Sequence, residues 1–211
     1  MLDLARVRQE YMRDGLDESA VLADPLAQFA HWYDDAQKAE LTMPNAMALA
    51  TVSREHKPSQ RVVLLKGVDA GGFVFYTDYH SRKGREIDAN PQAALLFAWL
   101  PLERQIRIEG TLTRVQAAES DAYFATRPLG SRHAAIASPQ SAVIANRAAL
   151  EQRYTAAVRT TGDTPPRPPH WGGYRLMPLE MEFWQGRENR LHDRLVYRKT
   201  GDGWKMERLA P

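Results

Sequence analysis

Residues 182–194 read EFWQGRENRLHDR and place Arg190, His192 and Arg194 at every second position. A β-strand alternates its side chains between two faces, so one strand through this stretch would put two guanidinium groups and an imidazole on one face. Such a face is usually solvated. Trp184 and the aromatic run before it indicate that the strand is covered, and covered cationic groups need an anionic partner. The pattern therefore favours an anion-binding face.

A second cationic cluster is SRKGRE, residues 81–86. Ser81 is a predicted N-cap, with Glu86 further along the helix, so Arg82 and Lys83 fall in the first turn. Cations in the first turn interact unfavourably with the helix dipole, which favours negative charge at this end. An anion bound there would reverse this, because the free N–H groups and both side chains could hold it. Taken alone, the motif favours the simpler interpretation, a solvated turn.

A third cluster is RVVLLKG, in which Arg61 and Lys66 bracket four apolar residues. We expect the run to be buried on both faces, with its charged ends at the rims of a barrel. Ordinary snorkelling of the two side chains at strand ends explains the pattern equally well.

The fourth cluster is DAYFATRPLGS, in which Tyr123 and Arg127 are four residues apart and are expected to share a helix face. Ser131 follows the predicted end of that helix at Pro128. These groups could hold a phosphate, although a surface Tyr–Arg stack is the commoner arrangement. Together the four clusters offer more phosphate-binding groups than one phosphate needs. They suggest two phosphorylated ligands side by side, with aromatic residues flanking the rings of these ligands.

The elements that would position these clusters follow from the local sequence. Asp24 as N-cap and Pro25 at the first helical position predict an amphipathic helix over residues 24–41. Helices are also expected at 119–128 and 145–160, and a short one at 3–13. Short runs rich in β-branched and aromatic residues predict strands at 46–53, 60–68, 72–77, 93–100 and 104–115, and again within 173–209.

The turns between these strands suit an antiparallel barrel or sandwich. Hairpin turns are expected at residues 69–72 and 201–203, and residues 161–173 form a proline-rich connector. We therefore predict an α+β fold with one domain over residues 21–211. A loosely held segment over residues 1–20 precedes it.

Composition narrows the function classes. The chain of 211 residues is 44% hydrophobic and 26% charged, a globular balance, and its net charge of +2 argues against a general nucleic-acid binder. It has no cysteine, which excludes disulfides and thiolate metal sites and fits a reducing cytosol. No histidine pair with metal-ligand spacing and no GxGxxG, P-loop or GxSxG motif occurs, so no metal is predicted. With neither a membrane-length apolar run nor a signal peptide, we expect a soluble, cytoplasmic protein without membrane or nucleic-acid partners.

The opening stretch closely resembles the signature of the pyridoxine (pyridoxamine) 5′-phosphate oxidase family. The resemblance runs in order along nearly the whole chain, through RQEY at 8–11, QRVVLLK at 60–66, VFYT at 74–77, SRK at 81–83, LERQ at 102–105, YFATRP at 123–128, PQS at 139–141 and WKMERLAP at 204–211. It implies an FMN-binding split β-barrel, antiparallel and Greek-key-like with surrounding helices, that works as a homodimer with active sites at the interface.

The implied reaction is oxidation of pyridoxine 5′-phosphate or pyridoxamine 5′-phosphate to pyridoxal 5′-phosphate, in vitamin B6 cofactor biosynthesis and salvage. FMN accepts the hydride, and O₂ is reduced to hydrogen peroxide. The implied FMN contacts are Arg61, Lys66, Tyr76, Thr77, Arg82 and Lys83 from one subunit, with Gln105, Gln140, Ser141, Trp184 and Arg194, several of them supplied by the partner subunit.

The substrate residues follow from the same resemblance. Those implied to hold the substrate phosphate are Lys66, Tyr123, Arg127 and Ser131. Arg190 and His192 are the implied catalytic residues and lie over the substrate ring, while Arg194 reaches toward the flavin. Arg8 and Tyr11 would belong to a mobile segment that covers the substrate, although Gln9 departs from the basic residue that is commoner there.

Two alternatives stay open. One is a related flavin oxidase on the same barrel that acts on another substrate, such as a phenazine precursor. It should keep the flavin motifs and lose the substrate-phosphate residues, which are present here. The other is a non-catalytic carrier of flavin or pyridoxal phosphate, or a basic binding module.

Overall fold

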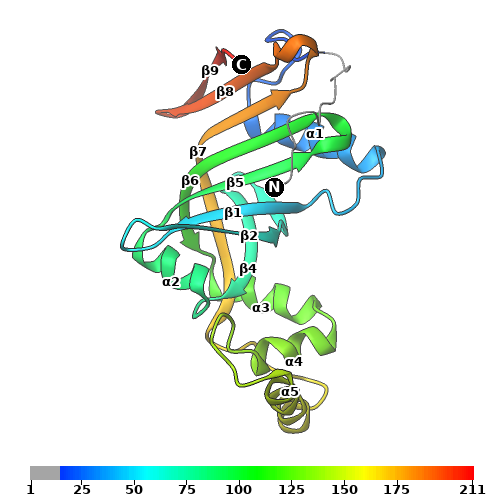
Figure 1. Ribbon diagram of the computed structural model, residues 1–211, viewed down its shortest axis with the longest axis vertical. Helices are drawn as coiled ribbons and strands as arrows, with labels where there is room; N and C mark the ends of the chain where they lie inside the picture. Colours follow the sequence, from blue (N-terminus) through cyan, green and yellow to red (C-terminus); the bar gives the residue numbers. More distant parts are fainter. Residues whose placement is uncertain (1–14) are drawn as a thin grey trace, which may run out of the picture. The chain divides into compact units, whose positions relative to one another are not determined.

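The computed structural model describes residues 15–211 (Figure 1). The elements are α1 (Pro25–Lys38), β1 (Ala46–Val52), β2 (Pro58–Leu64), β3 (Gly67–Asp69), β4 (Gly72–Asp78), α2 (Arg82–Ala89), β5 (Gln92–Trp99), η1 (Leu100–Leu102), β6 (Arg104–Arg114), α3 (Ala117–Thr126), α4 (Leu129–Ala137), α5 (Arg147–Thr161), β7 (Trp171–Gln185), η2 (Glu188–Arg190), β8 (Asp193–Thr200) and β9 (Gly203–Leu209). No helix in this part of the chain is long and apolar enough to cross a membrane.

The strands of the described residues form a nine-stranded sheet in the order β2-β1-β5-β6-β7-β4-β3, with β8 paired to β7 and β9 to β8. The pairs β3–β4, β4–β7, β7–β8 and β8–β9 are antiparallel. The predicted α+β architecture with an antiparallel sheet is thus confirmed. The chain divides into two compact units, and β1, β5, β6 and β7 each have residues in both.

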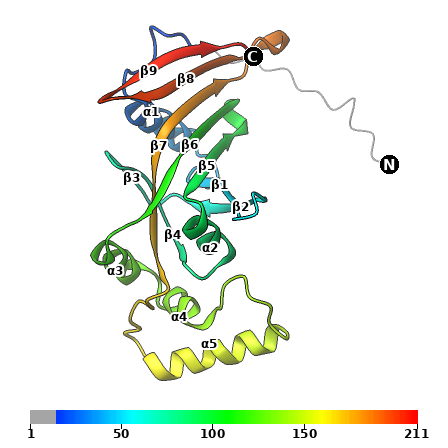
Figure 2. The same ribbon diagram turned by 90° about the vertical axis from the view of Figure 1, so that its left-hand side faces the viewer.

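Unit 1 comprises the described residues 15–48, 94–110 and 178–211. Helix α1 lies beside the strands of this unit (Figures 1 and 2). Between the helix and the strands, Phe29 packs against Phe97 at 5.1 Å and Trp32 meets the edge of Phe183 at 5.2 Å between ring centroids. The predicted start of α1 is confirmed, because the Asp24 carboxylate accepts a hydrogen bond from the Leu26 N–H at 3.1 Å. Tertiary packing of this aromatic face, rather than propensity alone, stabilises the helix.

Unit 2 comprises residues 49–93 and 111–177. Its α4 and α5 pack against each other, as Figure 2 shows. β7 begins with Trp171-Gly172-Gly173, and a Cβ at Gly172 would lie 2.0 Å from the Tyr79 hydroxyl oxygen, while one at Gly173 would lie 2.8 Å from the Tyr76 ring. Only glycine allows these two tyrosine side chains to lie across the start of β7.

The prediction that residues 182–194 form one strand is wrong. β7 ends at Gln185, η2 follows, and β8 returns antiparallel to β7 from Asp193. The reversal passes through Asn189 and Arg190, whose φ angles of 56° and 62° lie in the left-handed region. Arg190 is exposed and His192 lies in the loop, so the two do not share a strand face with Arg194.

The prediction that the apolar run of RVVLLKG is buried on both faces is also wrong. β2 stands at one end of the strand order and alternates in exposure, with the Val62 side chain 69% exposed. The strand ends at Leu64, so Lys66 lies in the link to β3. Because β2 is an edge strand, it pairs with a neighbouring strand on one side only. The side chains on one of its faces are left uncovered within this chain.

Sequence reasoning also missed α4. Ser131 lies inside this helix, and Arg127 is the C-cap of α3 with an extended backbone at φ −71° and ψ 146°, so Tyr123 and Arg127 do not share a helix face.

The predicted hairpin turns at 69–72 and 201–203 are confirmed by the β3–β4 and β8–β9 pairs. The helix expected at 3–13 lies outside the described residues.

Of the predicted N-terminal segment, residues 15–20 are described. Leu16 is buried, and its N–H donates to the Asp193 carboxylate at 2.9 Å. Its carbonyl accepts from Arg208, which also pairs with Glu18 at 2.6 Å. These contacts join the described end of the segment to β8 and β9 within unit 1.

Candidate functional site

Unit 2 contains a cavity of about 720 Å³. Its walls come from β2, β4, the start of α2, the α3–α4 junction, the segment before α5 and the first residue of β7. The cavity brings together these residues predicted from the sequence: Arg61, Lys66, Tyr76, Thr77, Lys83, Tyr123, Arg127, Ser131 and Gln140. Segments far apart in sequence thus supply four cationic groups to one hollow, which can attract an anionic ligand.

The start of α2 forms one part of this wall. The Ser81 hydroxyl caps the helix by accepting from the Gly84 N–H at 3.2 Å, which confirms the predicted N-cap. The Lys83 ammonium donates to the Thr77 hydroxyl at 3.1 Å and to the Gln140 amide oxygen at 2.9 Å. Burial lowers the pKa of Lys83, and the nearby Arg61 guanidinium lowers it further. An anion beside Lys83 would stabilise its charged form.

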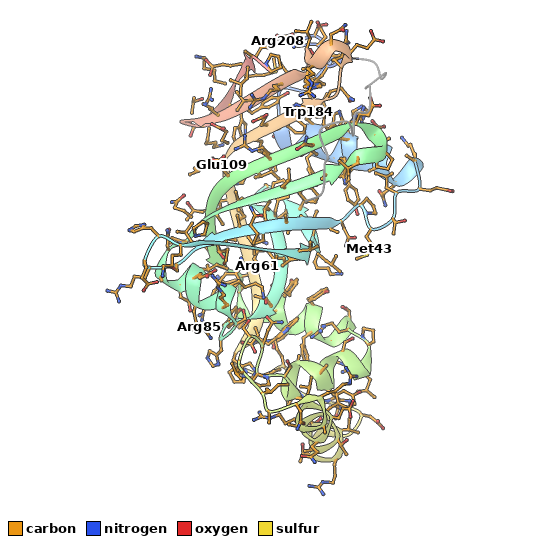
Figure 3. All side chains as sticks on the ribbon, viewed as in Figure 1. Met43, Arg61, Arg85, Glu109, Trp184 and Arg208 are labelled. Atoms are coloured by element: carbon orange, nitrogen blue, oxygen red, sulfur yellow. The ribbon has the colours of Figure 1, made fainter. Side chains whose placement is uncertain are left out.

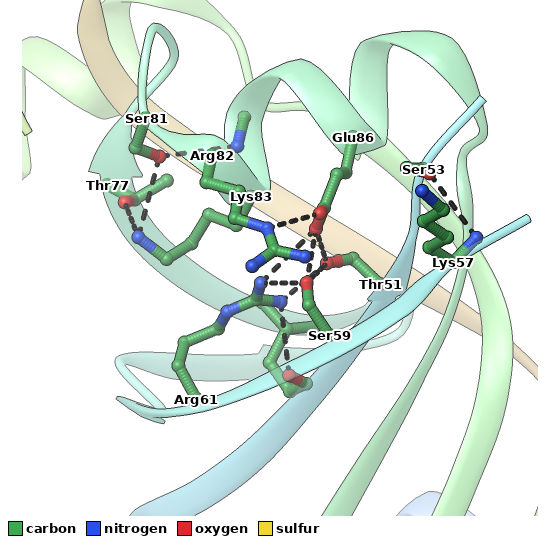
Figure 4. A network of polar contacts seen from close by, with 12 residues as sticks. Thr51, Ser53, Lys57, Ser59, Arg61, Thr77, Ser81, Arg82, Lys83 and Glu86 are labelled. Carbon is green, nitrogen blue, oxygen red and sulfur yellow. Dashed lines mark hydrogen bonds and ion pairs between the residues drawn. The ribbon is translucent and has the colours of Figure 1, made fainter. Parts of the chain in front are cut away.

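A buried carboxylate, Glu86, organises the arginines next to this wall (Figure 4). Glu86 accepts from Arg61 at 3.2 Å, from Arg82 at 2.8 Å and from the Ser59 hydroxyl at 2.6 Å. The Thr51 hydroxyl donates to the same carboxylate oxygen as Arg61 and Ser59. Glu86 therefore fixes two guanidinium groups that are predicted to contact FMN, although Arg82 itself does not line the cavity.

An aromatic stack forms another part of the cavity wall. The Tyr76 and Tyr123 rings stack at 3.9 Å, and both are nearly parallel to Trp171, at interplanar angles of 11° and 5°. Burial raises the pKa of Tyr76 to about 12, and the Glu119 carboxylate adds to the rise. Tyr76 is therefore a neutral phenol at physiological pH, and the stack offers a flat apolar surface beside the cationic groups.

Arg127 lies against this stack. Its guanidinium carbon is 4.5 Å from the centroid of Trp171, and burial lowers its pKa. Its Nη1 is buried and has no hydrogen-bond partner among the described residues. Unsatisfied buried donors are rare, and a phosphate oxygen is a suitable acceptor for a guanidinium. This donor set fits a phosphorylated cofactor or substrate.

The other predicted site residues of the described chain lie elsewhere. Ser141 is exposed in unit 2 and has a left-handed backbone with φ 70°. Unit 1 holds Gln105, Trp184, Arg190, His192 and Arg194; Figure 3 labels Trp184 in this unit and Arg61 in unit 2. Arg8 and Tyr11 lie outside the described residues. The predicted site residues are therefore divided between the units, and Trp184 of unit 1 lies next to His192 and is paired with Arg194.

In unit 1, Trp184 on β7 pairs with Arg194 on β8. The Glu182 carboxylate accepts from Arg194 Nε at 2.8 Å and Nη2 at 3.1 Å, and this hydrogen bonding raises the pKa of the Arg194 guanidinium. Glu182 is buried and also accepts from Arg107 at 2.9 Å. This bidentate pair fixes the guanidinium plane of Arg194 beside Trp184.

The β7–β8 loop carries the two predicted catalytic residues. The His192 ring lies 4.6 Å from Trp184, and its Nδ1 accepts from the Arg187 N–H at 3.1 Å. An accepting Nδ1 leaves Nε2 as the protonated nitrogen of the neutral ring. Burial lowers the pKa of His192, and the Arg190 guanidinium lowers it further, so the neutral form is favoured.

Two residues of the unit 2 site were not predicted. Trp171 lines the cavity beneath Arg127, and Glu86 was noted only as part of the helix after Ser81. The glycines after Trp171 could have signalled close packing there. No local pattern could have signalled Glu86, because three of its partners, Thr51, Ser59 and Arg61, lie on β1 and β2. Among the residues the structure describes, no group of three or more His, Cys, Asp or Glu could hold a metal ion.

Family models match most of the chain. The model described as pyridoxamine 5′-phosphate oxidase matches residues 33–160, and that described as the pyridoxine 5′-phosphate oxidase C-terminal dimerisation region matches residues 171–211. The chain is 57% identical over 214 residues to the pyridoxine/pyridoxamine 5′-phosphate oxidase of Burkholderia lata and 56% identical over 212 residues to that of Cupriavidus metallidurans, with the whole of each chain covered.

Solved structures agree with the fold. PhzG from Burkholderia lata, in complex with tetrahydrophenazine-1-carboxylic acid, is 34% identical with a TM-score of 0.88, over 94% of this chain and 98% of that one. A pyridoxamine 5′-phosphate oxidase-related, FMN-binding protein from Nostoc punctiforme is 20% identical with a TM-score of 0.73, over 90% of this chain and 99% of that one, and this likeness concerns the fold alone. The predicted split β-barrel is confirmed, and the chain belongs to the pyridoxamine 5′-phosphate oxidase family.

Proposed function

We propose that this protein is an FMN-dependent oxidase that converts pyridoxine 5′-phosphate and pyridoxamine 5′-phosphate to pyridoxal 5′-phosphate. The alcohol and O₂ would give the aldehyde and hydrogen peroxide; the amine would also consume water and release ammonia. The observation that carries the proposal is the unit 2 cavity, which collects four cationic side chains against a stacked aromatic wall. Family membership and the names of its relatives support the same reaction.

The residues of unit 2 fit an FMN phosphate at the start of α2. Lys83 and Thr77 would hold it there, with Arg61 and Arg82 kept in place by Glu86. Gln140, which contacts both Lys83 and Thr77, would turn its amide toward the cofactor. When bound, FMN supplies a flavin that accepts a hydride and passes electrons to O₂.

A second group of residues in the same cavity would hold the substrate phosphate. Lys66, Tyr123, Arg127 and Ser131 all line it, and Arg127 has an unsatisfied buried donor. Holding a phosphate away from the reacting carbon would orient the ring, and such positioning can contribute strongly to catalysis. The unphosphorylated vitamins should accordingly be poor substrates.

Arg190 and His192 of unit 1 would act on the substrate ring. An arginine stays protonated, so Arg190 would orient the substrate and stabilise negative charge rather than accept a proton. His192, held neutral by burial and by Arg190, could accept a proton from the substrate or hold it by a hydrogen bond. The match to a dimerisation region supports a homodimer. We place the active sites at its interface, with Gln105, Trp184 and Arg194 completing the flavin site and Arg8 and Tyr11 covering the substrate.

One alternative has an observation in its favour, the likeness to PhzG. A PhzG-like oxidase would have no use for the substrate-phosphate residues that line the cavity here. The test is peroxide formation by the FMN-loaded protein with pyridoxine 5′-phosphate, pyridoxine and tetrahydrophenazine-1-carboxylic acid. The proposal expects turnover of the phosphorylated vitamin far above the other two. Oxidation of the phenazine compound alone would overturn it in favour of the alternative, and binding of flavin without any turnover would indicate a carrier.

A further inference from the structure

Arg127 is held differently from several other arginines in unit 2. Arg61, Arg82, Arg114, Arg167 and Arg175 each pair with a carboxylate. No carboxylate pairs with Arg127 in the described part of the chain. Its guanidinium carbon instead lies 4.5 Å from the Trp171 centroid and 5.7 Å from that of Phe124. Aromatic rings, rather than a carboxylate, thus lie against this positively charged group in the cavity.

Trp171 is itself firmly held. It is buried, its backbone N–H donates to the Pro168 carbonyl at 3.0 Å, and its backbone carbonyl accepts from the Arg167 guanidinium at 2.7 Å. The Phe124 ring meets it edge-on at 5.2 Å, and the Tyr123 ring is parallel to it within 5°. Burial and these ring contacts restrain the indole, so it can orient the residues that lie against it.

We propose that Trp171 is a positioning residue for the substrate phosphate, an uncharged platform that orients Arg127 and Tyr123 without neutralising the arginine. The inference rests on the proposed function, since it takes Arg127 as a phosphate ligand. A carboxylate can also orient an arginine, as Glu86 does for Arg61 and Arg82, but it takes up some of the guanidinium N–H groups and offsets the positive charge. Cation–π contact with an indole fixes the guanidinium plane and leaves its N–H groups and full charge for the ligand.

The platform sets specificity for phosphorylated over unphosphorylated substrates. Binding of pyridoxal 5′-phosphate and of pyridoxal to the FMN-loaded protein, measured by equilibrium dialysis, isolates the phosphate contribution without turnover. In Trp171→Leu we expect the dissociation constant for pyridoxal 5′-phosphate to rise about 10-fold, that for pyridoxal to stay within about twofold, and FMN affinity to change little. KM for pyridoxine 5′-phosphate should rise in parallel, with kcat nearly unchanged.

Trp171→Phe is the matched variant. It keeps an aromatic ring, but a phenyl ring binds cations less strongly than an indole. We therefore expect the dissociation constant for pyridoxal 5′-phosphate to rise about threefold and that for pyridoxal to stay unchanged. This variant carries the test if Trp171→Leu does not fold. When Arg127→Met is already present, adding Trp171→Leu or Trp171→Phe should not further reduce the preference for pyridoxal 5′-phosphate over pyridoxal.

The outcomes distinguish a failure of the proposed function from a failure of the positioning role of Trp171. A wild-type protein that does not prefer pyridoxal 5′-phosphate over pyridoxal contradicts the proposed function. If the wild type shows that preference and the Trp171 variants keep it in full, or weaken both ligands equally, the positioning role is wrong.

Discussion

Glu86 gives the sharpest prediction about stability. Its carboxylate is 6% exposed and is shared by Arg61, which is 18% exposed, and Arg82, which is 58% exposed. Removing one partner of a buried ion pair costs about 3–5 kcal/mol, whereas exposed pairs contribute only about 0–1 kcal/mol. Arg61 retains some solvent contact, so we expect Glu86→Ala to lower the free energy of unfolding by about 3 kcal/mol at neutral pH.

The pH dependence follows from the same contacts. Burial by itself would raise the pKa of Glu86, but hydrogen bonds from Ser59, Thr51, Arg82 and Arg61 outweigh burial and lower the pKa to about 2, from an ordinary value of 4.5. The folded-state pKa is thus below the unfolded one. Ionised Glu86 therefore stabilises the fold fully above the ordinary value, and this stabilisation is lost as the pH falls from 4.5 through about 2.

Glu86→Gln isolates this charge because it keeps the shape and one acceptor oxygen. Urea unfolding of the apo-protein should show the variant less stable than wild type by about 1–3 kcal/mol at neutral pH. The difference should shrink as the pH falls below 4.5. Glu151→Gln is the matched control, since Glu151 pairs with Arg147 on an exposed helix face and should change stability by less than about 0.5 kcal/mol. A difference at Glu86 that does not change with pH would refute the reasoning.

Three further predictions concern the proposed ligands. Lys83→Ala should weaken FMN binding by about 10- to 100-fold, because a charge-assisted hydrogen bond is lost, and unchanged flavin occupancy in the purified protein would remove Lys83 from the phosphate site. Arg190→Ala should lower kcat by about 100-fold with little change in FMN retention, with Arg187→Ala in the same loop as control; equal loss of turnover and flavin would contradict the role given to Arg190. Because burial and Arg190 lower the pKa of His192, a role as proton acceptor predicts that kcat/KM rises with pH through a value below 6.5 and that His192→Asn loses this rise; an unchanged profile would leave His192 only a binding role.

Local hydrogen bonding made parts of the fold predictable from the sequence. Asp24 and Ser81 start α1 and α2 because their side chains satisfy free N–H groups within the next turn. The turn over residues 69–72 likewise depends on a short polar stretch, in which Asp69 accepts from the Gly71 N–H. Such features involve residues close in the chain, so a single sequence is enough to identify them.

Non-local contacts explain the failures. The alternation of Arg190, His192 and Arg194 imitates a strand, yet the chain reverses there because β8 pairs with β7 and β9. A helix does end before Pro128 as predicted, since α3 stops at Thr126, but the sequence did not reveal that Pro128 is also the N-cap of a further helix, α4. The roles of Glu86 and Trp171 depend on partners from other strands and helices, and no spacing along the chain indicates them.

Anaerobic mixing of the FMN-loaded protein with pyridoxine 5′-phosphate, followed by flavin absorbance, tests the central claim most directly. We predict that the flavin absorbance is lost with the substrate, and that admitting air restores it with formation of hydrogen peroxide and pyridoxal 5′-phosphate. Pyridoxine without its phosphate should reduce the flavin far more slowly, because the cavity residues that include Arg127 have no phosphate to hold. A flavin that stays oxidised with both the alcohol and the amine phosphates would contradict the proposed reaction.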